Sequence, residues 1–194
     1  MGLAAARLPL GLALVLALML PQLPRAAVAQ PPAEEARSKV EAAFLRNFAR
    51  YIVWPAQAFD NARSPWAVCL LGEDRLGESL PDTLKGRIEQ GRSFEIRQAE
   101  APEALSGCHI VFITIANPAQ RRLVLARLKD KPVLTVGNAV DFLAEGGVIR
   151  LLPGERMEMG VNLDQARNAS LGIPTKLLEV SRDVLENGVL RRLR

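Results

Sequence analysis

Short apolar runs alternate with stretches of helical periodicity through most of the chain. Four runs have the length and composition of buried strands and are predicted at residues 66–71, 93–97, 109–113 and 133–136. Helical segments are expected between and after them, at residues 75–84, 102–105, 117–129 and 139–144. Strands that alternate with helices are typical of an α/β layered domain with a largely parallel sheet. The wholly apolar run Ile110–Ile113 fits a central strand that is covered on both faces.

A longer helix is predicted ahead of the first strand, over residues 36–53. Apolar side chains recur there every fourth residue and form a stripe, which two further residues widen: Val40, Phe44, Phe48 and Ile52, with Ala43 and Tyr51. Asn47 lies among them, and we expect it to be a buried, hydrogen-bonded structural residue. The helix should end at Trp54, because Pro55 disfavours the helical conformation in the residue before it.

The C-terminal third of the chain has a different pattern. Residues 148–152 and 157–161 are two predicted strands joined by a turn at Pro153-Gly154, so this last strand pair is expected to be antiparallel and at one edge of the sheet. Residues 163–169 and 175–185 have helical patterns. The predicted fold class is therefore α/β: a single layered domain with a mixed, mostly parallel sheet flanked by helices, and with an antiparallel edge hairpin.

The N-terminus carries the three parts of a secretory signal peptide in order. Arg7 is the positive segment, residues 8–20 are apolar, and Ala27-Val28-Ala29 is a cleavage site of small residues. The alternative is an uncleaved anchor helix, but the apolar stretch is shorter than the roughly 20 residues that span a bilayer. We expect residues 1–29 to be removed, leaving residues 30–37 as a flexible lead-in to an exported, periplasmic domain.

Export would also change the charge of the chain. The sequence has 25 basic and 21 acidic residues, and two of the arginines, Arg7 and Arg25, lie in the predicted signal peptide. The net charge of +4 then falls to about +2, which gives little support for a nucleic-acid partner. Arg191, Arg192 and Arg194 lie in a predicted basic tail, residues 187–194. Such a tail is most often a solvated, frayed end, and a docking role is the alternative.

The two cysteines are the sharpest local feature. Cys69 lies within the first predicted strand and Cys108 directly precedes the central one. An even number of cysteines in an exported protein favours a disulfide, and only one pairing is available. Two independent buried thiols are the alternative. The sequence leaves open whether such a bond would be regulatory or purely structural.

The sequence offers few candidate catalytic residues. His109 is the only histidine, which excludes metal sites made of several imidazoles and makes a histidine-based triad depend on one residue. A structural hydrogen bond is the commoner role for a histidine at such a position. A nucleophilic pair of Cys108 and His109 is formally available, but a disulfide would consume the thiol. We therefore expect no catalytic residues, no metal and no cofactor.

A turn after the first strand lies where α/β folds place ligand loops. Its candidate ligand residues are Gly72, Glu73, Asp74 and Gly77. The turn lacks the glycine spacing of a dinucleotide site, and its two carboxylates would repel a phosphate. A tight turn followed by a helix cap is therefore the favoured interpretation.

The hairpin of residues 151–159 is the candidate recognition surface, because methionines adapt to partners and here flank charged residues. Met157 and Met159 could equally face the core. The predicted partner-binding residues are Phe142, Ile149, Leu152, Arg156, Met157, Glu158 and Met159.

Several motifs, taken in order, resemble the YfiR family of periplasmic regulators. They are Asn47-Phe48 before Trp54-Pro55; residues 69–74 with Gly77; residues 107–113; residues 132–136; Phe142, Gly146-Gly147 and Ile149; Asn162-Leu163 before Ala166; and residues 176–178. Each motif is weak by itself, but their order and spacing are specific. The resemblance spans residues 38–181, and the corresponding domain is predicted at residues 38–186.

The resemblance implies a Rossmann-like α/β domain, a homodimer, and a bridge between Cys69 and Cys108. It also implies a non-enzymatic role, in which the protein binds the periplasmic domain of an inner-membrane diguanylate cyclase and holds the cyclase inactive. Release, through redox change or through sequestration by an outer-membrane lipoprotein, would raise cyclic di-GMP and promote biofilm formation.

Two alternatives to this regulatory role remain open. The membrane partner could equally be a sensor histidine kinase, because the sequence names no output domain. The protein could instead be a periplasmic receptor for a small molecule or nucleotide that binds in the crevice at the strand ends.

Overall fold

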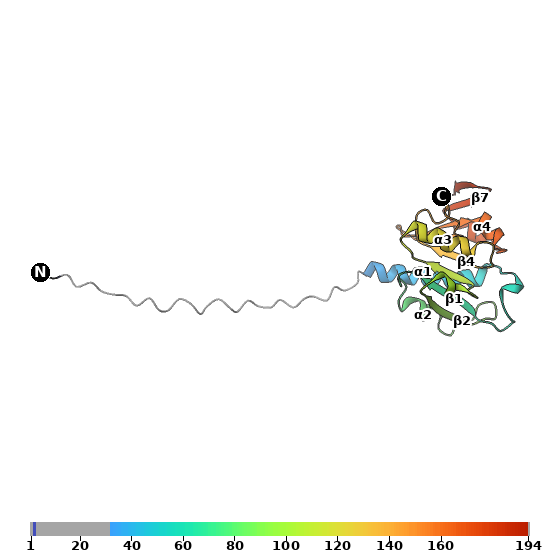
Figure 1. The fold of residues 1–194 in the computed structure, drawn as a ribbon, viewed down its shortest axis with the longest axis horizontal. Helices are drawn as coiled ribbons and strands as arrows, with labels where there is room; N and C mark the ends of the chain where they lie inside the picture. The colour runs from blue at the N-terminus through green and yellow to red at the C-terminus, as the bar shows by residue number, and fades with distance from the viewer. Residues whose placement is uncertain (1, 3–31, 194) are drawn as a thin grey trace. The chain divides into compact units, whose positions relative to one another are not determined.

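The computed structural model describes Gly2 and residues 32–193. The predicted signal peptide and its cleavage site lie outside these residues. The strands are β1 (Trp66–Leu71), β2 (Phe94–Ala99), β3 (Ile110–Ile113), β4 (Leu134–Gly137), β5 (Ile149–Leu152), β6 (Glu158–Asn162), β7 (Asp183–Glu186) and β8 (Val189–Arg192). The α-helices are α1 (Pro32–Tyr51), α2 (Ser79–Leu84), α3 (Pro118–Leu128), α4 (Leu163–Asn168) and α5 (Thr175–Glu179), with 3₁₀ turns η1 (Ala56–Ala58) and η2 (Pro102–Leu105) (Figure 1). No helix among them is long and apolar enough to cross a membrane.

All of these strands belong to one sheet, in the order β2-β1-β3-β4-β5-β6-β7-β8. Neighbours from β2 to β5 are parallel, as are β6 and β7, whereas β5–β6 and β7–β8 are antiparallel. The predicted α/β fold class with a mostly parallel sheet is thus confirmed. The hairpin at Pro153-Gly154 joins β5 to β6 as predicted, but it is not at the edge, because β7 and β8 extend the sheet beyond it.

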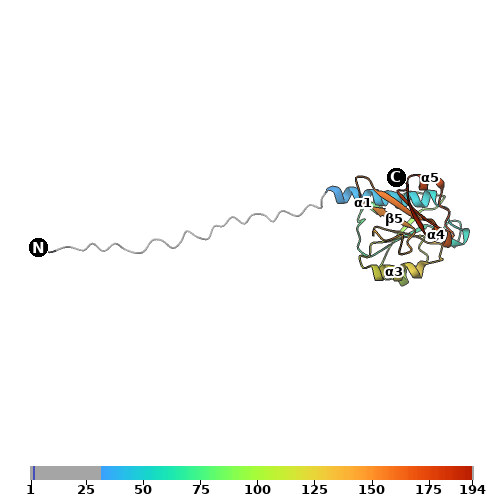
Figure 2. The ribbon, with the colours of Figure 1, turned by 90° about the horizontal axis from the view of Figure 1, so that it is seen from above.

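Helices cover both faces of the parallel half of the sheet. In Figure 2, α1 lies on one side of the strands and α3 on the other. Alternate residues of β3 serve the two sides: Ile110 and Phe112 pack in the cluster that includes α1, while Val111 and Ile113 pack in the cluster that includes α3. The period of two along a strand requires this division, and it explains why the central strand is apolar at every position.

The predicted stripe of helix α1 is confirmed in part: Phe48 and Ile52 are buried and Phe44 is half-buried, but Val40, Ala43 and Tyr51 are exposed. The buried apolar residues of α1 are Ala42, Leu45, Phe48 and Ala49, and Ile52, directly after the helix, is buried with them. Val40 is 42% and Tyr51 45% exposed, and Asn47 is exposed as well, so the prediction of a buried Asn47 is wrong. A strict spacing of four residues drifts by about 40° around a helix at each step, so a stripe defined by that spacing leaves the buried face.

The helix after β3 begins as predicted. The Asn117 side chain accepts hydrogen bonds from the backbone N–H groups of Ala119 and Gln120 at 2.9 and 3.1 Å, and Pro118 occupies the first turn. The helix predicted at residues 139–144 is wrong, because those residues form a series of turns. Its apolar pattern reflects the burial of Phe142 and Leu143 rather than helical periodicity.

Residues 183–192 form a hairpin, where the end of a helix and the start of a frayed tail were predicted. Helix α5 ends at Glu179, and the rest of the predicted helix 175–185 is replaced by β7. Asn187 and Gly188, with φ of 52° and 72°, form a two-residue turn into β8. Asn-Gly between short apolar runs is the strongest local hairpin signal, and the prediction gave it no weight.

Candidate functional site

The predicted bridge between Cys69 and Cys108 is present. It joins the middle of β1 to Cys108, which lies two residues before β3, across a sequence separation of 39 and a Cα–Cα distance of 6.0 Å. Cys69 is 0% and Cys108 3% exposed, and both belong to the core cluster on the α3 side of the sheet. The alternative of two free thiols is therefore wrong. A bond this deeply buried is poorly accessible to a thiol reductant while the fold is intact.

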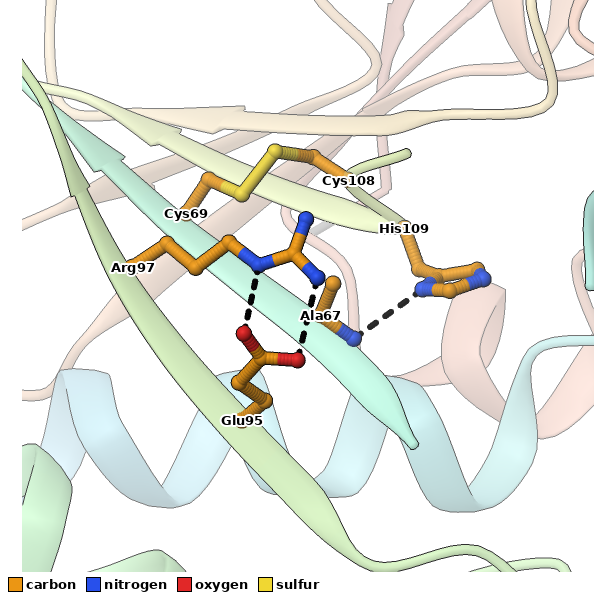
Figure 3. The surroundings of a disulfide bond; sticks show 6 residues. All are labelled: Ala67, Cys69, Glu95, Arg97, Cys108 and His109. Carbon is orange, nitrogen blue, oxygen red and sulfur yellow. Dashed lines mark hydrogen bonds and ion pairs between the residues drawn. A yellow bond between two sulfur atoms is a disulfide. The ribbon is translucent and has the colours of Figure 1, made fainter. Parts of the chain in front are cut away.

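An ion pair lies beside this bond on the neighbouring edge strand (Figure 3). Arg97 is aligned with Cys69 in the β1–β2 register, and its Nε and Nη2 atoms donate to Glu95 at 2.8 and 3.0 Å. These hydrogen bonds lower the pKa of the Glu95 carboxyl and raise the pKa of Arg97. The edge strand therefore carries its own neutralised charge pair next to the disulfide.

His109 is buried, and both of its ring nitrogens have partners. Its Nδ1 atom accepts a hydrogen bond from the Ala67 N–H at 3.0 Å, so Nε2 carries the proton and donates to the Ala58 carbonyl at 3.0 Å. The ring stacks on Phe59 with centroids 4.2 Å apart, and the Arg92 guanidinium lies 3.7 Å from the centroid of that same phenyl ring.

Burial lowers the pKa of His109, with a backbone hydrogen bond to Ala58 opposing the shift and Arg92 and Arg97 adding to it. The imidazole is thus a neutral linker between β1, β3 and the loop before β1. A general base would need a free nitrogen, and neither nitrogen is free. The structural interpretation of His109 therefore fits its geometry, and Cys108 offers it no thiol.

The turn after β1 lies at the topological switch point, because β1 and β3 are neighbours that continue in opposite directions across the sheet. Asp74 accepts hydrogen bonds from the N–H groups of Leu76 and Gly77 at 3.1 and 2.9 Å. The Thr114 hydroxyl donates to the Glu73 carbonyl at 2.7 Å and so joins the loops that follow β1 and β3.

The backbone of this turn is closely fitted. Gly72 has φ of +110°, and a Cβ at this position would lie 2.6 Å from the Thr114 hydroxyl oxygen. The predicted ligand residues Gly72, Glu73, Asp74 and Gly77 therefore come together in one exposed turn, but two of its N–H donors are already taken by a carboxylate. The geometry favours the tight-turn interpretation over a ligand loop. The tight-turn interpretation also predicted a helix cap after the turn, and this cap is absent. Glu78, the N-cap residue of α2, makes no side-chain hydrogen bond to the first turn of the helix.

An open groove of about 590 Å³ lies elsewhere, between α2 and β2. Its apolar lining is Pro81, Leu84, Ile88, Phe94 and Ile96. Charged side chains of both signs, including Asp82 and Lys85, also line it. The groove shares none of the predicted ligand residues. Among residues 32–193, no three histidine, cysteine or acidic side chains gather in a way that could hold a metal ion.

The predicted partner-binding residues divide into two groups. Phe142 and Ile149 are 0% exposed and Met159 is 2% exposed, so these three belong to the core and present no surface in this structure. The other four are Leu152, Met157 and Glu158, which are half-buried, and Arg156, which is exposed. Met157 packs against the α1-side core, while Arg182 bonds to Glu158. The tip and outer strand positions of the β5–β6 hairpin are the part of the predicted surface that remains accessible.

Phe142 has a definite structural role in place of the predicted one. Its ring lies between Gly137, the last residue of β4, and Gly147, and a Cβ at either glycine would overlap the ring. The turn that carries it is fixed by Arg121, which donates from Nε and Nη2 to Glu145 at 2.5 and 2.8 Å. Both side chains of this pair are 6% exposed. The Phe142 ring, wedged between the two glycines, and the Arg121–Glu145 ion pair together hold the turn that connects β4 to β5.

Sequence reasoning missed the polar links that hold the C-terminal strands. Arg150 of β5 pairs with Asp183 of β7 across β6, where the aligned residue is Gly160. A Cβ at Gly160 would lie 2.9 Å from Leu143 Cδ1 and 3.3 Å from Arg150 Nη2, so a side chain here would crowd both Leu143 and the ion pair. Asp164 of α4 accepts from the N–H groups of Asn187 and Gly188, both at 2.9 Å. One signal in the sequence pointed to the Arg150–Asp183 pair: Arg150 is a charged residue within an otherwise apolar strand.

Comparison with known protein families gives one match. The family model described as YfiR/HmsC-like matches residues 38–182, about three quarters of the chain. The match starts within α1 and includes the disulfide, His109 and the β5–β6 hairpin. It ends immediately before β7, so the β7–β8 hairpin lies beyond it.

Proposed function

The chain belongs to the YfiR/HmsC-like family, and on that basis we propose that it is an exported, periplasmic protein that binds the periplasmic domain of an inner-membrane diguanylate cyclase and holds the cyclase inactive. The family as a whole consists of periplasmic regulators of cyclic di-GMP signalling. The match over residues 38–182 is the single observation that carries the proposal. The disulfide agrees with it, because such bonds form and persist in oxidising compartments.

The physical logic of such a regulator is differential binding. A protein that acts without chemistry can shift its partner only by binding one of the partner's states more tightly than the other. A shift from about 99% active to about 99% inactive cyclase requires a preference of roughly 10⁴-fold for the inactive state. A rigid domain supports such a preference, because little binding energy is then spent on ordering the regulator itself.

The accessible part of the β5–β6 hairpin is the proposed contact with the cyclase. Leu152 and Met157 supply apolar surface there, and Arg156 supplies an exposed charge at the tip. Glu158 is held by Arg182, which fixes its direction. The same proposal includes a homodimer and an outer-membrane lipoprotein that withdraws the regulator from the cyclase, and sedimentation of the purified protein tests the dimer.

The decisive experiment deletes the gene and measures cyclic di-GMP in cells that express the candidate cyclase. We expect the cyclic di-GMP level to rise, and to return to its original value when the wild-type gene is restored. Restoration with Arg156→Glu should fail, whereas Arg63→Glu, a matched charge reversal on an exposed loop of the parallel half, should succeed. An unchanged cyclic di-GMP level in the deletion strain would rule out repression of that cyclase.

A receptor for a small molecule or nucleotide has less support. The crevice that such a receptor would use lies at the ends of β1 and β3, where Thr114 and Asp74 tie the loops together. A sensor kinase in place of the cyclase would leave cyclic di-GMP unchanged in the deletion strain, so the same experiment separates the two membrane partners.

A further inference from the structure

The open edge of the sheet at β8 has the hydrogen-bonding pattern of a docking strand. In the β7–β8 register Val184 is aligned with Arg191 and Asp183 with Arg192, and the Leu193 N–H donates to the Arg182 carbonyl at 2.7 Å. Hydrogen-bonded pairs alternate along an antiparallel ladder, so the main-chain groups of residues 189, 191 and 193 face β7. The N–H and C=O groups of residues 190 and 192 therefore point away from the sheet.

Aliphatic side chains are exposed along this edge, beside the two arginines of β8. Val189, Leu190 and Leu193 are 54%, 56% and 50% exposed. Edge strands are normally protected by charge, proline, a bulge or a covering element. At the opposite edge of the sheet, β2 follows this rule with its Glu95–Arg97 pair and half-buried apolar residues. The strand β8 presents aliphatic side chains and an open ladder together.

The charge of the same edge is basic and largely uncompensated. The two acidic residues of the hairpin are engaged elsewhere, Asp183 by Arg150 and Glu186 by Arg167. Arg192 lies 3.6 Å from Asp183 and shares that carboxylate, while Arg191 makes no ion pair among residues 32–193. Two copies of β8 side by side would bring four arginines together, which disfavours a second copy of this chain as the occupant.

From these observations we infer that β8 adds an extended, acidic segment of a partner protein to the sheet as a further strand. The outward main-chain groups of residues 190 and 192 provide the ladder, Leu190 and Leu193 contact apolar positions of the segment, and Arg191 and Arg192 contact its carboxylates. The site lies outside residues 38–182 and is separate from the β5–β6 tip. It rests on the proposed function only for the expectation that the segment belongs to the regulated membrane protein.

The test measures binding of short fluorescent peptides to the purified full-length protein by anisotropy. Side chains of β8 alternate between the two faces of the sheet, so Leu190 and Arg192 share one face while Arg191 and Leu193 share the other. The probes are therefore a peptide with a repeated Val-Val-Glu-Glu sequence, which carries valine and glutamate on both faces, its Val-Val-Lys-Lys counterpart, and a copy of the acidic peptide with methylated backbone nitrogens. We expect the acidic peptide to bind at least roughly tenfold more tightly than either of the others, and more weakly at high salt. Equal binding of the acidic and basic peptides, or of the methylated and unmethylated acidic peptides, overturns the inference.

Two variants localise the binding. Leu190→Pro removes an outward-facing N–H and leaves the ladder with β7 intact, so it should abolish binding of the acidic peptide. Arg63→Glu, on the exposed loop before β1, is the charge control and should bind as the wild type does. Arg191→Glu tests the charge without a change in the backbone hydrogen bonds. It should lower the affinity for the acidic peptide roughly tenfold.

The remaining outcomes also decide the matter. A dimer that dissociates in the Leu190→Pro variant would show that a second copy occupies the edge, against the inference. Peptide binding with no effect of gene deletion on cyclic di-GMP would support the docking strand and refute only the proposed function. A cyclic di-GMP rise on deletion without peptide binding would do the reverse.

Discussion

Strands β1–β4 and strands β5–β8 form one sheet and share one apolar core cluster, but they differ in how their strands are held to one another. The parallel half is covered by helices on both faces, its central strand is apolar at every position, and a buried disulfide joins β1 to the segment that precedes β3. The C-terminal half depends more on directed polar contacts: Arg150–Asp183 across β6, Arg167–Glu186 between α4 and β7, and Asp164 on the turn between β7 and β8. Apolar packing tolerates small shifts, whereas such pairs require particular partners.

This difference bears on function. The segments proposed to meet partners, the β5–β6 tip and the β8 edge, both lie in the half that polar contacts position. Elements that bind partners are usually drawn from the less stable parts of a fold. The parallel half then serves as the rigid support for these surfaces.

The junction between the halves is where a single change should have the largest effect. Phe142→Ala would leave a cavity between Gly137 and Gly147 and should lower the free energy of unfolding by about 3–5 kcal/mol. Chemical denaturation measures this loss. The control is Leu123→Ala on the exposed surface of α3, where truncation leaves no cavity. Its free energy of unfolding should stay within about 0.5 kcal/mol of the wild-type value. Equal stability of the two variants would contradict the wedge role of Phe142.

Removal of the disulfide should have the next largest effect, in the parallel half. The double variant Cys69→Ala, Cys108→Ala opens a loop of 39 residues, which corresponds to about 4 kcal/mol in the chain-entropy model and less where the alanines repack. Unfolding of the variant compared with unfolding of the reduced wild type separates the bond from the packing. If both match the oxidised wild type, the bond contributes no stability, and a regulatory role would gain weight.

Breaking the pair across β6 tests the polar half. Asp183→Asn leaves the Arg150 guanidinium buried without its carboxylate and should cost about 2–4 kcal/mol, as for other broken buried pairs with some solvent access. The double variant Arg150→Met, Asp183→Leu should recover most of this loss, because both charges are then gone. A double variant as unstable as Asp183→Asn would show that packing, rather than the unpaired charge, carries the effect.

His109 should make stability depend on pH. Its pKa in the folded state lies below the ordinary value of 6.5, so above pH 6.5 both folded and unfolded states are neutral and the full contribution is present. As pH falls below 6.5 the unfolded state binds a proton first, and the free energy of unfolding decreases until pH passes the folded-state pKa. Thermal unfolding between about pH 8 and pH 5.5 measures this slope. His109→Gln should be less stable at pH 8 and should lose this part of the slope, and a wild-type slope in the variant would assign it to other groups.

The smallest effect should be a local one at the β7–β8 turn. The N–H groups of Gly188 and Asn187 lower the pKa of Asp164, and Asp164→Asn removes one of its two acceptor oxygens. Amide exchange should accelerate in β8 and remain unchanged in β3. Asp82→Asn on exposed α2 provides the matched control. Acceleration in both strands would mean that the turn is coupled to global unfolding instead.

Local sequence features predicted the parallel half well. The apolar runs that became β1, β3 and β4 were recognisable because a strand covered on both faces admits few polar residues. Asn117 before Pro118 marked the start of α3, since capping is decided by neighbouring residues alone. The bond between Cys69 and Cys108 followed from the number of cysteines and the expectation of export.

Most of the incorrect predictions concern residues whose burial depends on contacts with distant parts of the chain. The buried face of α1 depends on what the helix packs against, which exposes Asn47 and buries Leu45 in its place. The pattern around Phe142 suggested a helix and a partner surface, but two glycines from either side of it form its socket. Asn187-Gly188 is a local hairpin signal. It was overlooked because the residues before it have a helical pattern, which led to the prediction of a helix over residues 175–185.

The sequence by itself therefore determined the α/β class, the strands of the parallel half, the disulfide and the family resemblance, because periodicity, capping and cysteine number are properties of short stretches or of composition. Only the tertiary structure decided that Phe142, Ile149 and Met159 are core residues, that His109 is a neutral linker, and that residues 189–192 form an open, basic edge strand. Each of these depends on residues that meet only after the chain has folded, such as Gly137 with Gly147 and Arg150 with Asp183.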